Sequence, residues 1–241
     1  GGTFDITMID IKKDSVEVVC TGGDHNLGGK DWDDRIVAYM VDKYQEETET
    51  DEDILEDPDT WQDLQLSAEK AKKIMSQRDK TPISITHGGE RVKIVLEREK
   101  FEEITADLLE RTIDFTREML NAAKDKGYNK FDEIILVGGS TRMPQIQQRI
   151  KQEFDVTPKV FDPDEAIAKG AAIYGWKLSL NDGLIQRLAE KTKKSVEEFA
   201  NLSEMIETAQ VKPEDFKAAA QEVANDTGYT LPTIQSAMLR V

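Results

Sequence analysis

The stretch Asp132-Glu-Ile-Ile-Leu-Val-Gly-Gly-Ser-Thr-Arg-Met-Pro144 decides the fold expected for this chain of 241 residues. Ile134 to Val137 have the β-branched and aliphatic composition of a strand that is buried on both faces. Gly138-Gly139 ends the strand, and Pro144 supplies a first helical position for residues 145–150. Glycines let a ligand approach the backbone, and a helix N-terminus offers free N–H groups to a phosphate or a nucleoside. A purely structural turn is the alternative interpretation.

The composition excludes several classes of function. A hydrophobic content of 38% supports a globular core, either one large domain or two small ones. The net charge of −16 argues against a nucleic-acid groove, and no apolar run approaches the roughly 20 residues that span a bilayer. There is no signal-like N-terminus, and the single cysteine, Cys20, excludes an internal disulfide framework. We therefore expect a cytoplasmic protein that binds neither nucleic acid nor membranes.

Two polar features of the sequence have more than one interpretation. Residues 46–59 contain nine acidic residues and no lysine or arginine, which predicts a solvated surface loop, with an acidic docking site as the alternative. The two histidines, His25 and His87, are far apart in sequence, so they give little support to a metal site.

Hydrophobic periodicity predicts an alternation of strands and helices up to about residue 178. Two hairpins are expected, from residues 6–11 with 15–21 and from residues 82–87 with 91–96. Helices are expected over residues 30–45, 60–77, 99–124 and from 145, and a short strand over 158–161. A last helix follows residue 162, with Asp164 as its N-cap. The buried stripe of the helix over 60–77 is expected to contain Trp61, Leu64, Ala68, Ala71 and Met75.

Another face of the helix over residues 60–77 carries Glu69, Lys72, Lys73 and Ser76. Their spacing places one carboxylate, two ammonium groups and one hydroxyl in a single row. Judged from the residues alone, such a row is an ordinary solvated helix face with Glu–Lys pairs.

The character of the chain changes at Asn181. Four short helices are expected, over residues 184–192, 195–208, 213–224 and 232–238, with a capping box at Ser195-Val-Glu-Glu198 and with Pro213 and Pro232 at helix starts. A helix-turn-helix reader of DNA is an alternative for this region, but its mildly acidic charge disfavours it.

Four sequence segments occur together and in order: Gly1-Gly-Thr-Phe-Asp5, Gly23-Asp24 with Leu27-Gly-Gly-Lys-Asp-Trp-Asp33, Leu136-Val-Gly-Gly-Ser-Thr-Arg-Met-Pro144 and Asp162-Pro-Asp-Glu-Ala-Ile-Ala-Lys-Gly-Ala-Ala172. In this order they resemble the ATPase domain of the seventy-kilodalton heat-shock chaperone family, from Gly1 to about Leu178. The resemblance implies an α/β, actin-like ATPase fold in which two lobes close on a nucleotide. This chain resembles the second lobe.

The resemblance also implies an organisation into domains. Residues 1–29 and 106–178 correspond to a ribonuclease-H-like base, and residues 30–105 to a smaller mobile subdomain inserted into it. Residues 181–241, which lie outside the resemblance, are expected from their own sequence pattern to form an all-helical C-terminal region. The family's ligand is ATP or ADP, with Mg²⁺ in the complete two-lobed protein, and its protein partners are co-chaperones, exchange factors and clients.

Carried over position by position, the resemblance implies a set of nucleotide-binding residues: Gly1, Gly2, Thr3, Gly28, Gly29, Glu69, Lys72, Lys73, Ser76, Gly138, Gly139, Ser140, Arg142 and Asp164. The hydroxyl of Thr3 would lie near the terminal phosphate, and the guanidinium of Arg142 would stack on the base. Glu69, Lys72, Lys73 and Ser76 would close over adenine and ribose. Asp164 would lie near the loop that contains Arg142.

The sequence also departs from the family pattern. The aspartate that helps to hold hydrated magnesium would precede Gly1, and the first lobe, with its phosphate loop and catalytic lysine, has no counterpart here. We therefore expect a half-site that binds ATP or ADP weakly and does not turn over ATP alone, because phosphoryl transfer needs stabilisation from both sides of the phosphate. No family-type linker or β-rich peptide-binding domain follows Leu178, so conventional peptide clamping is not implied.

Two other functions compete with the ATPase half-site. One is a nucleotide-regulated interaction scaffold, in which the helical C-terminal region or the acidic segment recruits a protein partner. The other is a filament-forming actin-like protein, which the motif spellings disfavour.

Overall fold

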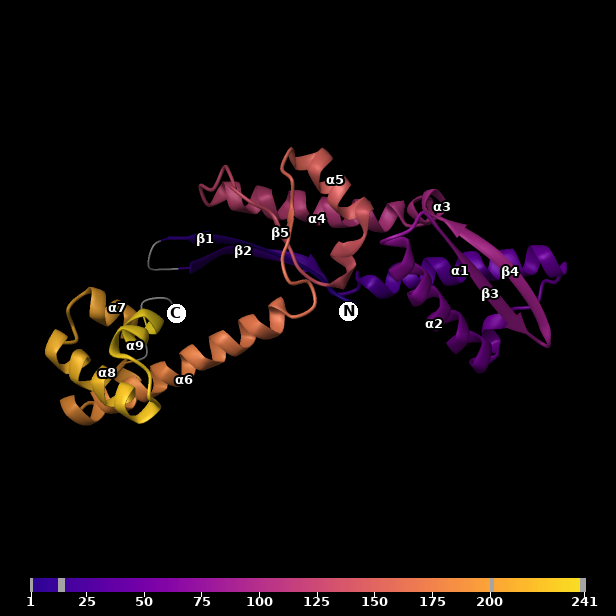
Figure 1. Cartoon of the computed structure of the whole chain (residues 1–241). Helices are drawn as coiled ribbons and strands as arrows, with labels where there is room; N and C mark the ends of the chain where they lie inside the picture. Colours follow the sequence, from indigo (N-terminus) through magenta and orange to yellow (C-terminus); the bar gives the residue numbers. More distant parts are fainter. Residues whose placement is uncertain (1, 13–15, 200–201, 239–241) are drawn as a thin grey trace. The chain divides into compact units, whose positions relative to one another are not determined.

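The computed structural model describes residues 2–12, 16–199 and 202–238 and has a mixed α/β composition (Figure 1). The chain divides into two compact units. The first unit comprises Gly1–Met8 and Val19–Asp164, and the second comprises Ile9–Val18 and Glu165–Val241. No helix among the described residues is long and apolar enough to cross a membrane.

The N-terminal strands pair as predicted. Strands β1 (Phe4–Ile11) and β2 (Val16–Asp24) form a two-stranded sheet. Cys20, on β2, is half-buried, and its Sγ lies 3.4 Å from Sδ of Met119.

The main core of the first unit lies between α1 (Gly29–Thr48), α2 (Pro58–Met75) and the antiparallel hairpin of β3 (Lys80–His87) and β4 (Glu90–Glu97). Helix α1 contacts α2, and α2 contacts β3 (Figure 1). The expected stripe on α1 is confirmed, since its buried residues include Trp32, Ile36, Met40 and Tyr44. The hairpin turn is also confirmed, with positive φ angles at Gly88 and Gly89 as a two-residue turn requires.

The prediction for Trp61 was wrong. Leu64, Ala68, Ala71 and Met75 are buried as predicted, but the side chain of Trp61 is 47% exposed. Thr60 is buried at this end of the stripe instead, and its N–H and hydroxyl donate to Asp57, the N-cap of α2. The capping interaction therefore turns Thr60 rather than Trp61 toward the core.

The acidic segment is also more ordered than predicted. Residues up to Thr48 continue α1, and a 3₁₀ helix, η1 (Ile54–Glu56), places the completely buried Ile54 in the core. Carboxylates of the segment cap the elements that follow it: Asp53 accepts from the N–H of Leu55 at 3.0 Å. The prediction of a simple solvated loop was therefore wrong, because the buried Ile54 and the capping carboxylates hold the segment in a defined conformation.

The single helix expected over residues 99–124 is two helices, α3 (Arg98–Ile104) and α4 (Ala106–Asp125). Thr105 separates them with φ −118° and ψ 6°, and its side chain is completely buried. Helix α3 contacts α1 and β4, whereas α4 contacts α5 (Pro144–Phe154). Hydrophobic periodicity continues across Thr105, so it did not reveal the break.

The strand expected to be buried on both faces is short and partly exposed. Strand β5 (Ile135–Leu136) pairs in parallel with β6 (Lys159–Val160), and among the described residues this sheet has two strands. The side chain of Ile135 is 54% exposed, which corrects the prediction of a doubly buried strand. A two-stranded sheet has too little area to cover both faces of either strand.

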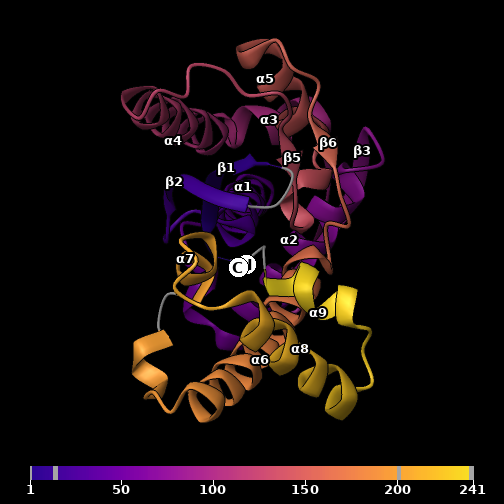
Figure 2. The same cartoon turned by 90° about the vertical axis from the view of Figure 1, so that its left-hand side faces the viewer.

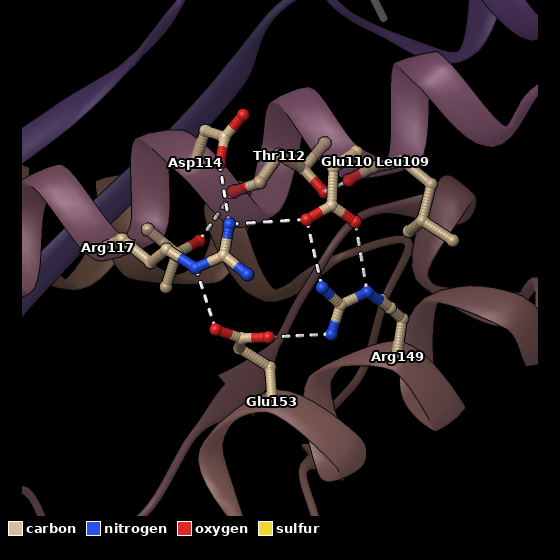
Figure 3. A network of polar contacts seen from close by, with 8 residues as sticks. Leu109, Glu110, Thr112, Asp114, Arg117, Arg149 and Glu153 are labelled. Atoms are coloured by element: carbon tan, nitrogen blue, oxygen red, sulfur yellow. Dashed lines mark hydrogen bonds and ion pairs between the residues drawn. The ribbon is translucent and has the colours of Figure 1, made fainter.

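A network of charged residues joins α4 to α5 (Figure 3). Arg149 donates to both carboxylate oxygens of Glu110, at 2.9 and 3.0 Å. Glu153 accepts from Nε of Arg117 at 2.7 Å and from Nη1 of Arg149 at 2.8 Å. Bidentate pairs of this kind fix the geometry of both partners, so the network orients α5 on α4.

We expect the substitution Glu153→Gln to reduce the acid sensitivity of the protein. The guanidinium groups of Arg117 and Arg149 lower the pKa of Glu153 from 4.5 to about 2. A lowered carboxyl pKa adds stability that is complete above the ordinary value and is lost as the pH falls toward the folded-state value. Thermal melts between about pH 5 and pH 2 should therefore show a smaller decrease in Tm for the variant than for the wild type. The same decrease in both proteins would contradict this role, and Glu118→Gln, at an exposed position of α4, serves as the control.

The second unit has a helical core of its own, formed by α6 (Ala166–Thr192), η3 (Val196–Phe199), α7 (Leu202–Glu207), α8 (Pro213–Thr227) and α9 (Leu231–Met238). Figure 2 shows α8 and α9 beside the C-terminal part of α6, in agreement with their contacts. The helix expected from Leu184 is the C-terminal part of α6. The N–H of Ser195 donates to Glu198 at 2.8 Å, one half of the expected capping box.

The assignment of Asp164 as a helix N-cap was wrong. The residue before α6 is Glu165, which makes no side-chain cap hydrogen bond. The carboxylate of Asp164 instead forms an ion pair with Arg142. A charged guanidinium is a stronger hydrogen-bond donor to a carboxylate than a neutral backbone N–H.

Candidate functional site

The three glycine turns singled out in the sequence are each followed or preceded by a residue of one hydrophobic cluster in the first unit. Phe4 comes directly after Thr3, Leu27 directly before Gly28, and Met143 directly after Arg142. Leu27 and Met143 are buried members of the cluster, and Phe4 packs against it. The core of the first unit therefore anchors all three turns.

The first turn, Gly2-Thr3, is exposed. No heavy atom would lie within 4 Å of a Cβ built on Gly2, so there is open space beside its backbone. Gly1, which belongs to the same predicted turn, lies outside the described residues.

The second turn begins α1. Gly28 is the N-cap, and its N–H donates to Oδ2 of Asp31 at 2.7 Å. The carbonyl oxygen of Gly29 accepts from Nζ of Lys72 at 2.6 Å, and the same ammonium group lies 2.7 Å from Oδ2 of Asp33. This contact brings α2, with the predicted polar row, to the second glycine turn.

The four residues of the row differ in what their side chains do. Glu69 and Lys73 form an exposed ion pair with an N–O distance of 2.7 Å, and each shifts the pKa of the other toward the charged form. The hydroxyl of Ser76 donates to the carbonyl of Lys72 at 3.4 Å. Lys72 itself is only 14% exposed, because its ammonium group is directed to α1. Glu69 and Lys73 are thus the members of the row whose charged groups face solvent.

The third turn has the strained backbone that glycine accommodates. Gly138 has φ +93°, and its N–H donates to the carbonyl of Pro163 at 2.8 Å. A short 3₁₀ helix, η2 (Gly139–Arg142), follows and leads into α5 at Pro144. Nη2 of Arg142 lies 2.5 Å from Oδ2 of Asp164, and both side chains are more than half exposed. A solvent-exposed ion pair is weak, so the guanidinium can leave it for a planar ligand at little cost in free energy.

Sequence reasoning gave no role to Asp33, which the structure places at the second turn. Its carboxylate is buried, and burial raises its pKa while the ion pair with Lys72 opposes that rise. The signal was present in the sequence, because Asp33 precedes Ile36 and Val37 by three and four positions and so falls on the buried stripe of α1. An acidic residue in such a stripe indicates a buried partner.

Among the residues that the structure describes, no group of three or more His, Cys, Asp or Glu side chains is placed to hold a metal ion. The exposed charged groups among the predicted site residues include the guanidinium of Arg142 and the Glu69–Lys73 pair.

The family model described as Hsp70 protein matches residues 1–210. The match covers all three glycine turns, the polar row on α2 and Asp164, and it extends past Leu178 into the helical C-terminal region. This family supplies a chaperone nucleotide-binding domain. The chain therefore belongs to the Hsp70 family.

Proposed function

We propose that this chain contributes a half-site for ATP or ADP, whose residues lie in the first unit and which corresponds to the second lobe of the Hsp70 nucleotide-binding domain. The observation that carries this proposal is the attachment of three glycine turns to one hydrophobic cluster through Phe4, Leu27 and Met143. Turns that are held by one core keep fixed positions relative to one another, which a shared ligand requires.

The proposed roles follow the chemistry at each turn. Gly2 and Thr3 contact the phosphates, and Gly28 and Gly29 lie beside the ribose and phosphates at the N-terminus of α1, where the helix dipole favours an anion. The guanidinium of Arg142 leaves its ion pair with Asp164 and stacks on the plane of the adenine. Within this proposal, residues 1–29 and 106–178 form the base of the lobe, and residues 30–105 form its mobile subdomain.

Turnover is assigned to the complete two-lobed ATPase. The site residues of this chain approach the phosphates from one side, and phosphoryl transfer depends on positioning and charge from both sides. In the complete protein, hydrolysis of ATP would gate the binding of a client or another protein partner.

We expect calorimetric titration with ADP at low salt to give a Kd of roughly 0.1–1 mM, or about 4–5.5 kcal/mol of binding free energy. Arg142→Ala should abolish the measurable heat, because it removes the stacking guanidinium. Arg91→Ala is the matched control, since it removes an exposed arginine of strand β4. The proposed site would be contradicted if Arg142→Ala and the wild type gave equal heats of ADP binding. It would also be contradicted if Arg91→Ala weakened ADP binding as much as Arg142→Ala does.

The second candidate function, an interaction scaffold, is favoured by the separate core of the second unit. Helix α6 also exposes large apolar side chains, namely Ile167, Ile173, Tyr174 and Leu178. Replacing Ile167 and Ile173 with serine tests this function against purified co-chaperones or exchange factors. If the serine variant no longer bound a partner but still bound ADP as the wild type does, the scaffold function would be supported. Unchanged partner binding would contradict it.

A further inference from the structure

A buried polar pair lies at the start of α5, immediately after the Gly138–Arg142 loop in sequence. Thr105 is completely buried, and Gln145 is 6% exposed. Nε2 of Gln145 donates to Oγ1 of Thr105 at 3.2 Å, and Oγ1 of Thr105 donates to the carbonyl of Phe101 at 2.7 Å. A buried polar group that loses its partner is destabilising, so each side chain constrains the position of the other.

This pair connects two groups of elements. Thr105 is the residue at which α3 ends and α4 begins. Helix α3 packs with α1 and β4, whereas α4 packs with α5. Gln145 reaches from α5 to the junction itself, so a rotation of α3 relative to α4 changes the hydrogen bond that holds the start of α5.

Helix α5 in turn carries the Gly138–Arg142 loop. Nε2 of Gln147 donates to the carbonyl of Thr141 at 3.0 Å, and the N–H of Met143 donates to the carbonyl of Ser140 at 3.1 Å. The side chain of Met143 is buried in the cluster that α1, α2, β3 and β4 also form. A displacement of the start of α5 therefore displaces the loop.

We infer that Gln145 is a positioning residue, which through Thr105 couples the α3–α4 junction to the Gly138–Arg142 loop. The inference deepens the proposed function and rests on it for its effect on nucleotide. When the hydrogen bond is present, the loop is held in one conformation. When it is absent, a smaller fraction of molecules has the binding-competent loop, and the apparent Kd for ADP rises in proportion.

Two near-isosteric substitutions separate positioning from simple stability. Gln145→Met keeps most of the side-chain volume without the amide, and Thr105→Val keeps the shape without the hydroxyl. Each single variant removes the hydrogen bond between the two side chains and lowers Tm, although in Gln145→Met the hydroxyl of Thr105 keeps its hydrogen bond to the carbonyl of Phe101. The double variant removes both partners, which is nearly neutral for stability. Gln148→Met, at an exposed position of α5, is the matched control.

We expect all three variants to change the amide chemical shifts of residues 138–142 and to raise the Kd for ADP about fivefold, the effect of one lost hydrogen bond. The double variant should keep both changes even though its Tm returns close to that of the wild type. Gln148→Met should change neither. These readouts are measured on the full chain.

The inference would be overturned if the double variant regained the wild-type chemical shifts of the loop and the wild-type ADP affinity together with the wild-type Tm. The pair would then contribute to packing alone. Single variants with wild-type loop shifts would overturn it as well. If the wild-type chain does not bind ADP, the proposed function fails, and the shifts of residues 138–142 still decide the coupling.

Discussion

Substitution of Gly23 by alanine is expected to destabilise the first unit by about 4 kcal/mol, among the largest effects of a single methyl group. A Cβ at Gly23 would lie 2.1 Å from the carbonyl oxygen of Phe4 and 3.1 Å from Cα of Asp5. Both are backbone atoms of β1, and the φ angle of +148° adds strain for any other residue. The clash can be relieved only by separating β1 from β2 beside the turn of Gly2 and Thr3.

The neighbouring substitution Gly22→Ala provides the control. Its Cβ would make ordinary contacts, at 3.5 Å from Cγ2 of Ile6 and 3.6 Å from Cβ of Met119. We expect it to change the stability by less than about 1 kcal/mol. Thermal melts followed by circular dichroism compare the two variants, and equal Tm values for Gly22→Ala and Gly23→Ala would show that the close approach of the strands is not needed.

Substitution of Lys72 by methionine is expected to destabilise the first unit by about 3 kcal/mol, because it breaks a buried ion pair. The side chains of Lys72 and Asp33 are 14% and 11% exposed. Among the described residues, Oδ1 of Asp33 has no hydrogen-bond partner, so Lys72 is the main compensation for a buried carboxylate. Lys73→Met is the control, because it removes the exposed pair with Glu69, which contributes little.

The effect of Lys72→Met should depend on pH in a defined direction. Burial already raises the pKa of Asp33, and loss of Lys72 raises it further. A raised carboxyl pKa means that the folded state binds more protons than the unfolded state, so stability falls as the pH rises through the window above 3.8. The deficit of the variant should therefore shrink between neutral pH and about pH 5. A deficit that is constant or grows on acidification would contradict the buried-charge explanation.

The elements with strong local patterns were predictable from the sequence. The stripe of Trp32, Ile36, Met40 and Tyr44 and the Gly88-Gly89 turn depend on residues close in the chain, and both are confirmed. The failures depend on tertiary context. Trp61 is exposed because the capping interaction directs Thr60 toward the core instead. The long helix breaks at Thr105, which is buried and accepts a hydrogen bond from Gln145 of α5.

The candidate site was predictable to a different extent. The glycine turns could be found from their sequence, but the proposal that they share one ligand came from the family resemblance rather than from any one motif. The pairs Lys72–Asp33 and Gln145–Thr105 join residues 39 and 40 positions apart, and no local pattern reports such contacts. Gln145 therefore became visible only in the folded chain, whereas the place of Asp33 on the buried stripe of α1 indicated a buried partner without identifying Lys72.

The central claim is that three separate glycine turns bind one nucleotide. Titration of the full ¹⁵N-labelled chain with ADP, followed by amide chemical shifts, tests it most directly. We predict that the amides of Thr3, of Gly28 and Gly29, and of residues 138–142 shift together and follow one saturation curve. Shifts confined to a single turn, or separate curves for the three turns, would contradict a shared nucleotide site.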